Sequence, residues 1–179
     1  MAFSDVYTGA NGTLTLVGTD SPEGAAADPI LENYSLSDAA AVGRVTGVEI
    51  HVETDLEEFH EIGHRHATSL HPGNIHIWGK VDRAYVNGAL LYLLLGRGAS
   101  PNNAAEPYVQ PALNMNIILD DPANPEIRSL IDLYGVRFEN WSFSLPEDDF
   151  VLENARFKAL RINVGDQHQD KTTSPTFGS

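Results

Sequence analysis

Residues 44–54 read RVTGVEIHVET, a stretch in which apolar and polar side chains alternate. Alternation with a period of two is typical of a β-strand with one buried face and one face in water. The apolar side chains, which would point to the buried face, are Val48, Ile50 and Val52. The polar side chains, which would point to the wet face, are Glu49, His51 and Glu53. The stretch therefore predicts a long strand that is half buried.

A second stretch, residues 73–86, reads GNIHIWGKVDRAYV and alternates in the same way. Its apolar side chains are Ile75, Ile77, Val81 and Tyr85, and its polar ones are His76, Lys80 and Asp82. Strands usually have about five or six residues, so two strands of this length are unusual in a small domain. They suit the wall of a β-barrel or a sheet that is shared between subunits.

Most of the remaining chain also predicts strands. Residues 13–17 and 113–119 read as short strands, and the apolar residues 89–95 predict a short helix between Asn87 and Gly96. Residues 127–134 fit a helix and a strand equally well. Two segments predict irregular structure, namely a surface loop or arm at residues 18–41 and a flexible C-terminal tail at residues 166–179.

A β-hairpin is expected near the C-terminus, where residues 136–145 and 151–164 flank an acidic turn at residues 146–149. The apolar side chains change sides between Phe138 and Trp141, which predicts a β-bulge near Glu139 and Asn140. Together the segments predict a mainly β protein (β+α) with one domain at residues 1–165.

The charge balance argues against a surface that grips nucleic acid. The chain of 179 residues has 11 basic and 25 acidic residues, a net charge of −14, whereas such surfaces are basic. The chain has no cysteine, which excludes disulfides and thiolate metal sites. The first residues lack the features of a signal peptide, and the longest apolar run is too short to span a bilayer. We expect a soluble intracellular protein without membrane insertion.

Residues 60–64 read HEIGH and match the pattern in which two histidines of a helix bind zinc beside a glutamate base. Gly63 lies inside the motif, and a helix starting near Asp55 would end at Ile62. The position of a third histidine in the extended motif is Leu70. We therefore expect no enzyme, and a zinc-dependent hydrolase using His60, Glu61 and His64 stays as an alternative.

Histidines are concentrated around this motif, since six of the seven lie between His51 and His76. A metal site at His60, His64 and His66 is one reading. The other, which we favour, is a solvated connector or subunit contact in which neutral histidine is a polar residue. No metal or other cofactor is then expected. The connector, residues 55–72, would present Asp55, Glu57, Glu58, His60, His64, Arg65, His66 and His71 to a neighbouring subunit or ring.

Residues 43–59 resemble the first long strand and connector of the tail tube proteins of tailed viruses, whether bacteriophages or archaeal tailed viruses. Residues 63–65 and 73–88 resemble the second strand, and the short helix at residues 89–95 is similar to the one that follows it. The segments 133–145 and 151–162 are similar to the family's C-terminal hairpin. The likeness is a pattern of strands and glycines.

The resemblance implies an antiparallel β-sandwich or half-barrel with one short flanking helix. It also implies a structural virion protein without enzymatic activity. Hexameric rings of the chain would stack into a tail tube, and each protomer would lend its long strands to a β-barrel that spans the ring. Partners would be the tape measure, tail terminator and baseplate or tail tip proteins and, in a contractile tail, a sheath protein. The tail would assemble in the host cytoplasm.

The polar strand faces would line an acidic lumen, through which DNA passes transiently because carboxylates repel phosphate. The lumen residues implied in this way are Glu49, His51, Glu53, His76, Lys80 and Asp82. The inner tube of a contractile injection system would use the same protomer fold, so this function stays open beside the viral one.

Overall fold

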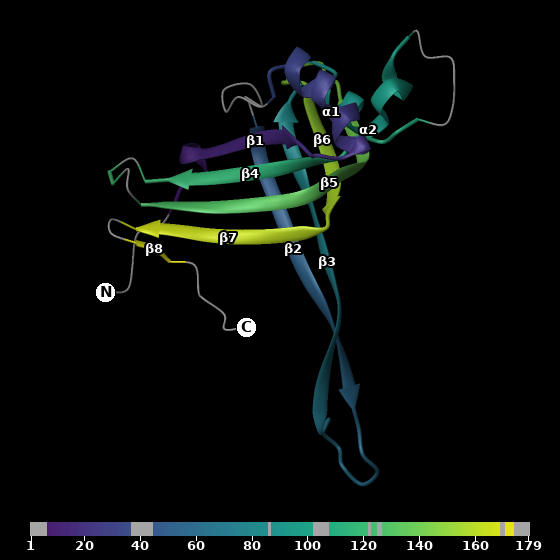
Figure 1. Ribbon diagram of the computed structural model, residues 1–179, viewed down its shortest axis with the longest axis vertical. Coiled ribbons are helices and arrows are strands. Elements are labelled where there is room, and N and C mark those ends of the chain that lie inside the picture. The colour runs from purple at the N-terminus through teal and green to yellow at the C-terminus, as the bar shows by residue number, and fades with distance from the viewer. Residues whose placement is uncertain are drawn as a thin grey trace.

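The computed structural model shows two crossing layers of strands, with helices at one end and a long hairpin projecting from the other (Figure 1). It describes residues 7–36, 45–85, 87–101, 108–121, 123–124, 127–168 and 171–173. The helices are η1 (Gly9–Asn11), α1 (Pro22–Asn33), α2 (Ala89–Leu95) and η2 (Gly96–Ala99). The strands are β1 (Gly12–Gly18), β2 (Val45–Phe59), β3 (Ser69–Ala84), β4 (Leu113–Asp120), β5 (Arg128–Ser144), β6 (Leu152–Ala159), β7 (Arg161–His168) and β8 (Lys171–Thr173).

Every strand pair is antiparallel, which confirms the predicted fold class. One layer, the first sheet, has the order β1-β4-β5-β7-β8. The other layer, the second sheet, has the order β5-β6-β3-β2. Because β5 belongs to both, the layers join along this strand and curl into a half-barrel (Figure 1).

β5 passes from the first sheet to the second at Gly135. Residues 128–134 pair with β7, and residues 137–144 pair with β6. Gly135 has a φ of +63°, in the left-handed region that glycine occupies without strain. A Cβ atom there would lie 2.6 Å from the side chain of Leu160, which separates β6 from β7. The single strand expected at residues 151–164 is therefore wrong, because the chain changes sheets at Leu160.

The core lies between the two sheets and beneath the helices. The rings of Phe138 and Phe157 meet edge to face in it, with their centroids 6.3 Å apart. Burial of one large apolar side chain contributes roughly 1.5–3 kcal/mol, so these contacts hold the layers together. The buried side chains come from every layer and include Leu16, Met115, Leu133, Phe138, Phe157, Leu90 and Leu93.

A buried polar network attaches α2, a predicted helix, to the second sheet. The side-chain oxygen of Asn87 accepts a hydrogen bond from the N–H of Ala89 at 3.2 Å. Arg83 donates to the carbonyl of Asn87 at 3.2 Å and to Oε1 of Glu153 at 2.7 Å. The other oxygen of Glu153 accepts from the indole N–H of Trp141 at 2.8 Å. The network therefore joins α2 to β3, β5 and β6.

The loop or arm expected at residues 18–41 is wrong where the structure describes it, because α1 occupies Pro22–Asn33. The hydroxyl of Ser21 accepts a hydrogen bond from the N–H of Gly24 at 3.0 Å, as a helix cap does. Pro22 takes the first helical position, where its missing N–H costs nothing. The fold thus has a second α-helix in addition to the predicted one. Residues 37–41 lie outside the described residues.

The hairpin of β2 and β3 extends well beyond the predicted strands. Pairing continues from Glu53 opposite His76 to Phe59 opposite Ser69, and residues 60–68 alone connect the strands. The connector expected at residues 55–72 is therefore wrong at both ends, as is a helix starting at Asp55. The pattern missed these residues because a ribbon that packs on nothing has no buried face and hence no apolar alternation.

Other predictions near the C-terminus are settled by the strand pairing. Residues 128–134, which fitted two structures, belong to β5, and the β-bulge is confirmed as a register shift between Phe138 and Asn140. Part of the expected tail is strand, because β7 ends at His168 and β8 spans Lys171–Thr173. Residues 169–170 and 174–179 lie outside the described residues. Among those described, no helix has the length and apolar character to cross a membrane.

Candidate assembly surfaces

The polar side chains predicted to share a face do share one, on the second sheet. The pairing of β2 with β3 sets Glu49 opposite Lys80 and Glu53 opposite His76. Directly opposed residues point to the same side of a sheet. We call this side the wet face. Its predicted members are Glu49, His51, Glu53, His76, Lys80 and Asp82.

Lys80 is the electrostatic centre of the wet face. Its Nζ lies 3.2 Å from Oδ2 of Asp82 and 3.2 Å from Oε1 of Glu49. Hydrogen bonds to Asp82 and to Glu49 raise the pKa of Lys80, because both favour the charged amine. Beside this group the ring of His51 stacks on Trp78 with their centroids 4.0 Å apart. The expected lumen residues thus form one connected polar surface.

The wet face also includes basic residues that sequence reasoning missed. β6 lies beside β3, and it places Arg156 opposite Lys80 and Lys158 opposite Trp78. β5 adds Arg137 opposite Lys158, and Glu139 reaches Lys158 at 3.1 Å. On β2 and β3 alone, the wet face has more carboxylates than basic residues. Over all four strands, the wet face has equal numbers of acidic and basic residues. The acidic members are Glu49, Glu53, Asp82 and Glu139, and the basic members are Lys80, Arg137, Arg156 and Lys158.

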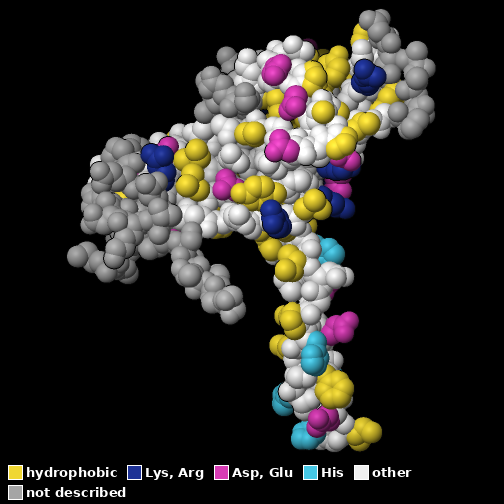
Figure 2. Space-filling model, viewed as in Figure 1, with side chains coloured by type: hydrophobic (Ala, Val, Ile, Leu, Met, Phe, Trp, Pro, Cys, Tyr) yellow, Lys and Arg dark blue, Asp and Glu magenta, His cyan; other side chains and the backbone are white. Residues whose placement is uncertain are grey.

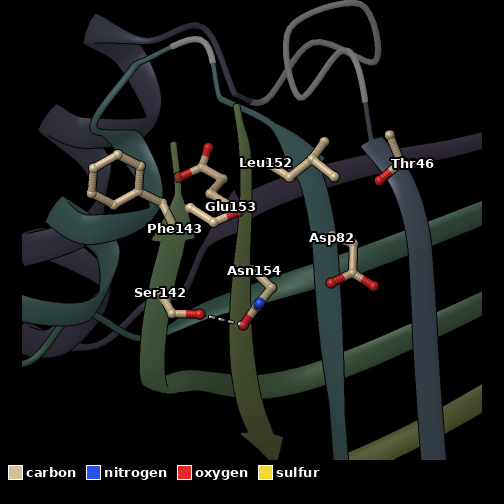
Figure 3. Close-up of a pocket in the computed structure, with 8 residues that line it drawn as sticks. Thr46, Asp82, Ser142, Phe143, Leu152, Glu153 and Asn154 are labelled. Atoms are coloured by element: carbon tan, nitrogen blue, oxygen red, sulfur yellow. Dashed lines mark hydrogen bonds between the residues drawn. The ribbon is translucent and has the colours of Figure 1, made fainter. Parts of the chain in front are cut away.

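A hollow of about 400 Å³ lies at the end of the second sheet that is remote from residues 60–68 (Figure 3). Thr46 and Asp82 line it from β2 and β3, and Ser142 donates a hydrogen bond to Asn154 at 3.0 Å across β5 and β6. One hollow is thus lined by all strands of the second sheet. The remaining lining residues are Phe143, Ser144, Leu152 and Glu153.

The second sheet has two edges along which the chain adds no further strand among the described residues. β2 forms one edge, and residues 140–144 of β5 form the other. The side-chain amide of Gln110 donates to the carbonyl of Phe138 at 2.7 Å and covers the start of the β5 edge. Open edges offer backbone N–H and C=O groups to another strand. Both edges of the second sheet are therefore open to strand pairing.

The outer half of the β2–β3 hairpin projects as a two-stranded ribbon with apolar side chains in water (Figure 2). Val52 is 53% exposed although it belongs to the apolar face of β2. Nearer the tip, Ile62 is fully exposed. An isolated ribbon is marginally stable at best, and exposed apolar groups mark interaction sites. The exposed apolar side chains at the outer end of the ribbon are Leu56, Phe59, Ile62 and Leu70, and we call this group the hairpin tip.

A second exposed apolar group lies at the turn between β5 and β6, and sequence reasoning missed it. Phe150 is 80% exposed and Leu145 is 76% exposed. The rings of Tyr85 and Phe143 lie 5.8 Å apart in the same group. Large apolar residues that flank an acidic turn were the available signal, read only as a hairpin. This turn cluster consists of Tyr85, Phe143, Leu145, Phe150 and Leu152.

The HEIGH motif lies in the bend at the hairpin tip. The backbone N–H of His64 donates to the carbonyl of Glu61 at 3.1 Å, which closes a turn and not a helix. Nε2 of His60 lies 3.1 Å from Oε2 of Glu58. The motif therefore lacks the helical geometry that a zincin requires. Within the described residues, no three histidine, aspartate or glutamate side chains gather closely enough to hold a metal ion.

The other predicted contact residues are distributed along the ribbon. Nε2 of His76 lies 3.2 Å from Oδ2 of Asp55, and the ring of His71 meets Phe59 edge to face. His64, Arg65 and His66 are exposed in the bend. The ribbon therefore presents these side chains to solvent from both of its strands.

Comparison with known proteins shows which fold this is. No family model matches the sequence, and no curated protein matches it. The tube-terminating cap of the anti-feeding prophage matches with a TM-score of 0.58 and 11% identity, covering 92% of this chain and 93% of that chain. The sheath/tube terminator of an extracellular contractile injection system, PVC, matches with 0.57 and 10% identity, covering 91% and 99%.

The SPP1 tail tube, determined by solid-state NMR and cryo-EM, matches with a TM-score of 0.54 and 8% identity, covering 92% of this chain and 81% of that chain. At these identities the likeness concerns the fold. It confirms the fold that the sequence resemblance implies. The chain has the fold of tail tube and tube-terminator proteins.

Proposed function

We propose that this chain is a structural protomer of a viral tail tube. Copies of the chain form hexameric rings, the rings stack into a tube, and DNA passes through the lumen to the host. The protein is not an enzyme. Its partners are the tape measure protein, the tail terminator and the baseplate or tail tip proteins. The tail is its site of action, after assembly in the host cytoplasm.

The observation that carries the proposal is the second sheet with its two open edges. An exposed edge is an aggregation hazard in a monomer. If the β2 edge of one copy pairs with the β5 edge of the next, each interface is head-to-tail. A ring closes when the rotation from one copy to the next is a whole-number fraction of a full turn. Ring closure would satisfy both edges of every copy at once.

The wet face supports a role as channel lining. Most of its charged side chains are exposed, and the acidic and basic members are equal in number. Such a face would let DNA slide, because the carboxylates beside Lys80 and Lys158 offset the attraction of these amines for phosphate. The balance of charges in the described face favours low adhesion over strong repulsion.

A second candidate is a tube or tube-terminator subunit of a contractile injection system. The observation in its favour is that the tube cap and the sheath/tube terminator match the chain over more than nine-tenths of its length. The protomer contacts would be the same in both candidates. They differ in the cargo, which is DNA in the viral tail.

The purified chain should pass from monomers to hexamers or longer polymers as protein concentration or salt increases. Salt screens the repulsion between protomers whose net charge is −14. Sedimentation velocity across a concentration and salt series would measure this. A protein that stays monomeric under all these conditions would contradict the proposal.

A further inference from the structure

We propose that the hairpin tip of one copy docks on the turn cluster of a second copy in the next ring. The inference rests on the proposed function and adds to it the surface that receives the hairpin. It identifies the contact that joins ring to ring, whereas the open sheet edges join copies within a ring.

The two surfaces lie at opposite ends of the same strands. Leu152, in the turn cluster, pairs with Ala84 at the end of β3. The hairpin tip begins where β3 starts, at Ser69 opposite Phe59. An extended strand rises about 3.3 Å per residue, so the length of β3 separates the ends by roughly 50 Å. A copy that is translated along this direction brings its turn cluster to the hairpin tip of its neighbour.

Both ends expose large apolar side chains that the protomer itself does not cover. Ile62 is fully exposed at the tip. At the turn, Phe150 is 80% exposed. Burying such groups against each other is favourable in proportion to the area removed from water. The two apolar surfaces are therefore suited to each other.

The charges favour contact between unlike ends over contact between like ends. The acidic turn carries Glu147, Asp148 and Asp149 without a basic residue, whereas the bend at the tip balances Glu61 with Arg65 and adds three histidines. Two turn clusters in symmetric contact would bring two sets of three carboxylates together, which is unfavourable. The bend at the tip has a single carboxylate, Glu61, so contact between the tip and the turn avoids this repulsion.

A contact between two different surfaces of one chain repeats from copy to copy. Such a heterologous contact generates an open polymer when it does not close on itself. The tip-to-turn contact therefore extends along the tube axis without a fixed end. Tube length would then be set by other proteins and not by this contact.

Disulfide trapping tests the contact, because the chain has no cysteine and every disulfide must come from introduced residues. Oxidised tubes of a protein with both Ile62→Cys and Phe150→Cys should give a ladder of linked chains on a non-reducing gel. An equal mixture of the two single variants should give linked pairs. Tubes of either single variant alone should give only unlinked chains on the gel. The matched control pairs Ile62→Cys with Val17→Cys, an exposed residue of β1.

Two results would overturn the inference. One is linkage of Ile62→Cys to Val17→Cys as readily as to Phe150→Cys. The other is a double variant that forms tubes in electron micrographs but gives no ladder. In both cases the proposed function survives, because the tubes themselves have formed. If the wild-type chain forms no rings or tubes, the proposed function fails first.

A substitution that blocks the contact gives an independent readout. Phe150→Asp should still form rings but should raise the protein concentration needed for tubes by about tenfold or more. Ring-sized particles should accumulate in electron micrographs. Phe150 is exposed in the protomer, so the ring itself should tolerate the change. Normal tubes from Phe150→Asp at the wild-type concentration would contradict the inference.

Discussion

Replacing Glu153 by alanine should lower the free energy of unfolding by about 3–5 kcal/mol. The side chains of Arg83 and Glu153 are 1% and 0% exposed, so the substitution leaves a buried guanidinium without its carboxylate. The indole N–H of Trp141 loses its acceptor as well. Both groups face desolvation without compensation, and α2 loses part of its attachment to the second sheet. Denaturation by guanidinium chloride, followed by circular dichroism, would measure the loss.

The matched control is Glu139→Ala, which removes a carboxylate from an exposed pair. Glu139 lies 3.1 Å from Lys158, and the side chains of Lys158 and Glu139 are 70% and 44% exposed. Exposed pairs of this kind are worth about 0–1 kcal/mol, so the control should unfold near the wild-type midpoint. Equal effects of the two substitutions would show that the Arg83 network does not stabilise the fold.

Replacing Val52 by aspartate should abolish ring and tube assembly while the protomer remains folded. Val52 is half exposed in the protomer, so the change should alter its free energy of unfolding by about 0.5 kcal/mol or less. In the proposed assembly, a neighbouring copy would cover the apolar face of β2. An unpaired charge there would lose its hydration without a partner. Sedimentation velocity and thermal unfolding would separate the two effects.

Glu53→Lys is the control, because Glu53 follows Val52 directly and points to the wet face. A wide, wet channel tolerates a change of charge, so the tubes should form. In complete particles the added positive charge should slow DNA ejection, because it attracts phosphate. If Glu53→Lys abolishes assembly and Val52→Asp does not, the two faces of the sheet have been assigned the wrong way round.

The sequence predicts those elements whose faces differ in polarity. The inner halves of β2 and β3 alternate because one side packs on the core, and β4 does so for the same reason. The outer hairpin has no such contrast, so its strands read as a loop. α1 was missed although Ser21 and Pro22 form a clear helix start, because Gly24 and Pro29 interrupt the segment.

The candidate surfaces depend on which strands become neighbours, and no local pattern shows this. Arg156 and Lys158 alternate with buried residues, yet only the pairing of β6 with β3 places them on the wet face. Leu160 has no signal in the sequence that marks a change of sheet. The turn cluster combines Tyr85 with residues far along the chain, so it exists only in the folded protein.

A cryo-EM reconstruction of tubes formed by the purified chain would test the central claim most directly. The account predicts rings in which the β2 edge of each copy pairs with the β5 edge of the next, forming one closed barrel. His51 and Lys80 should face the lumen. Rings in which the edges of the second sheet stay unpaired, or in which the first sheet lines the channel, would contradict the account.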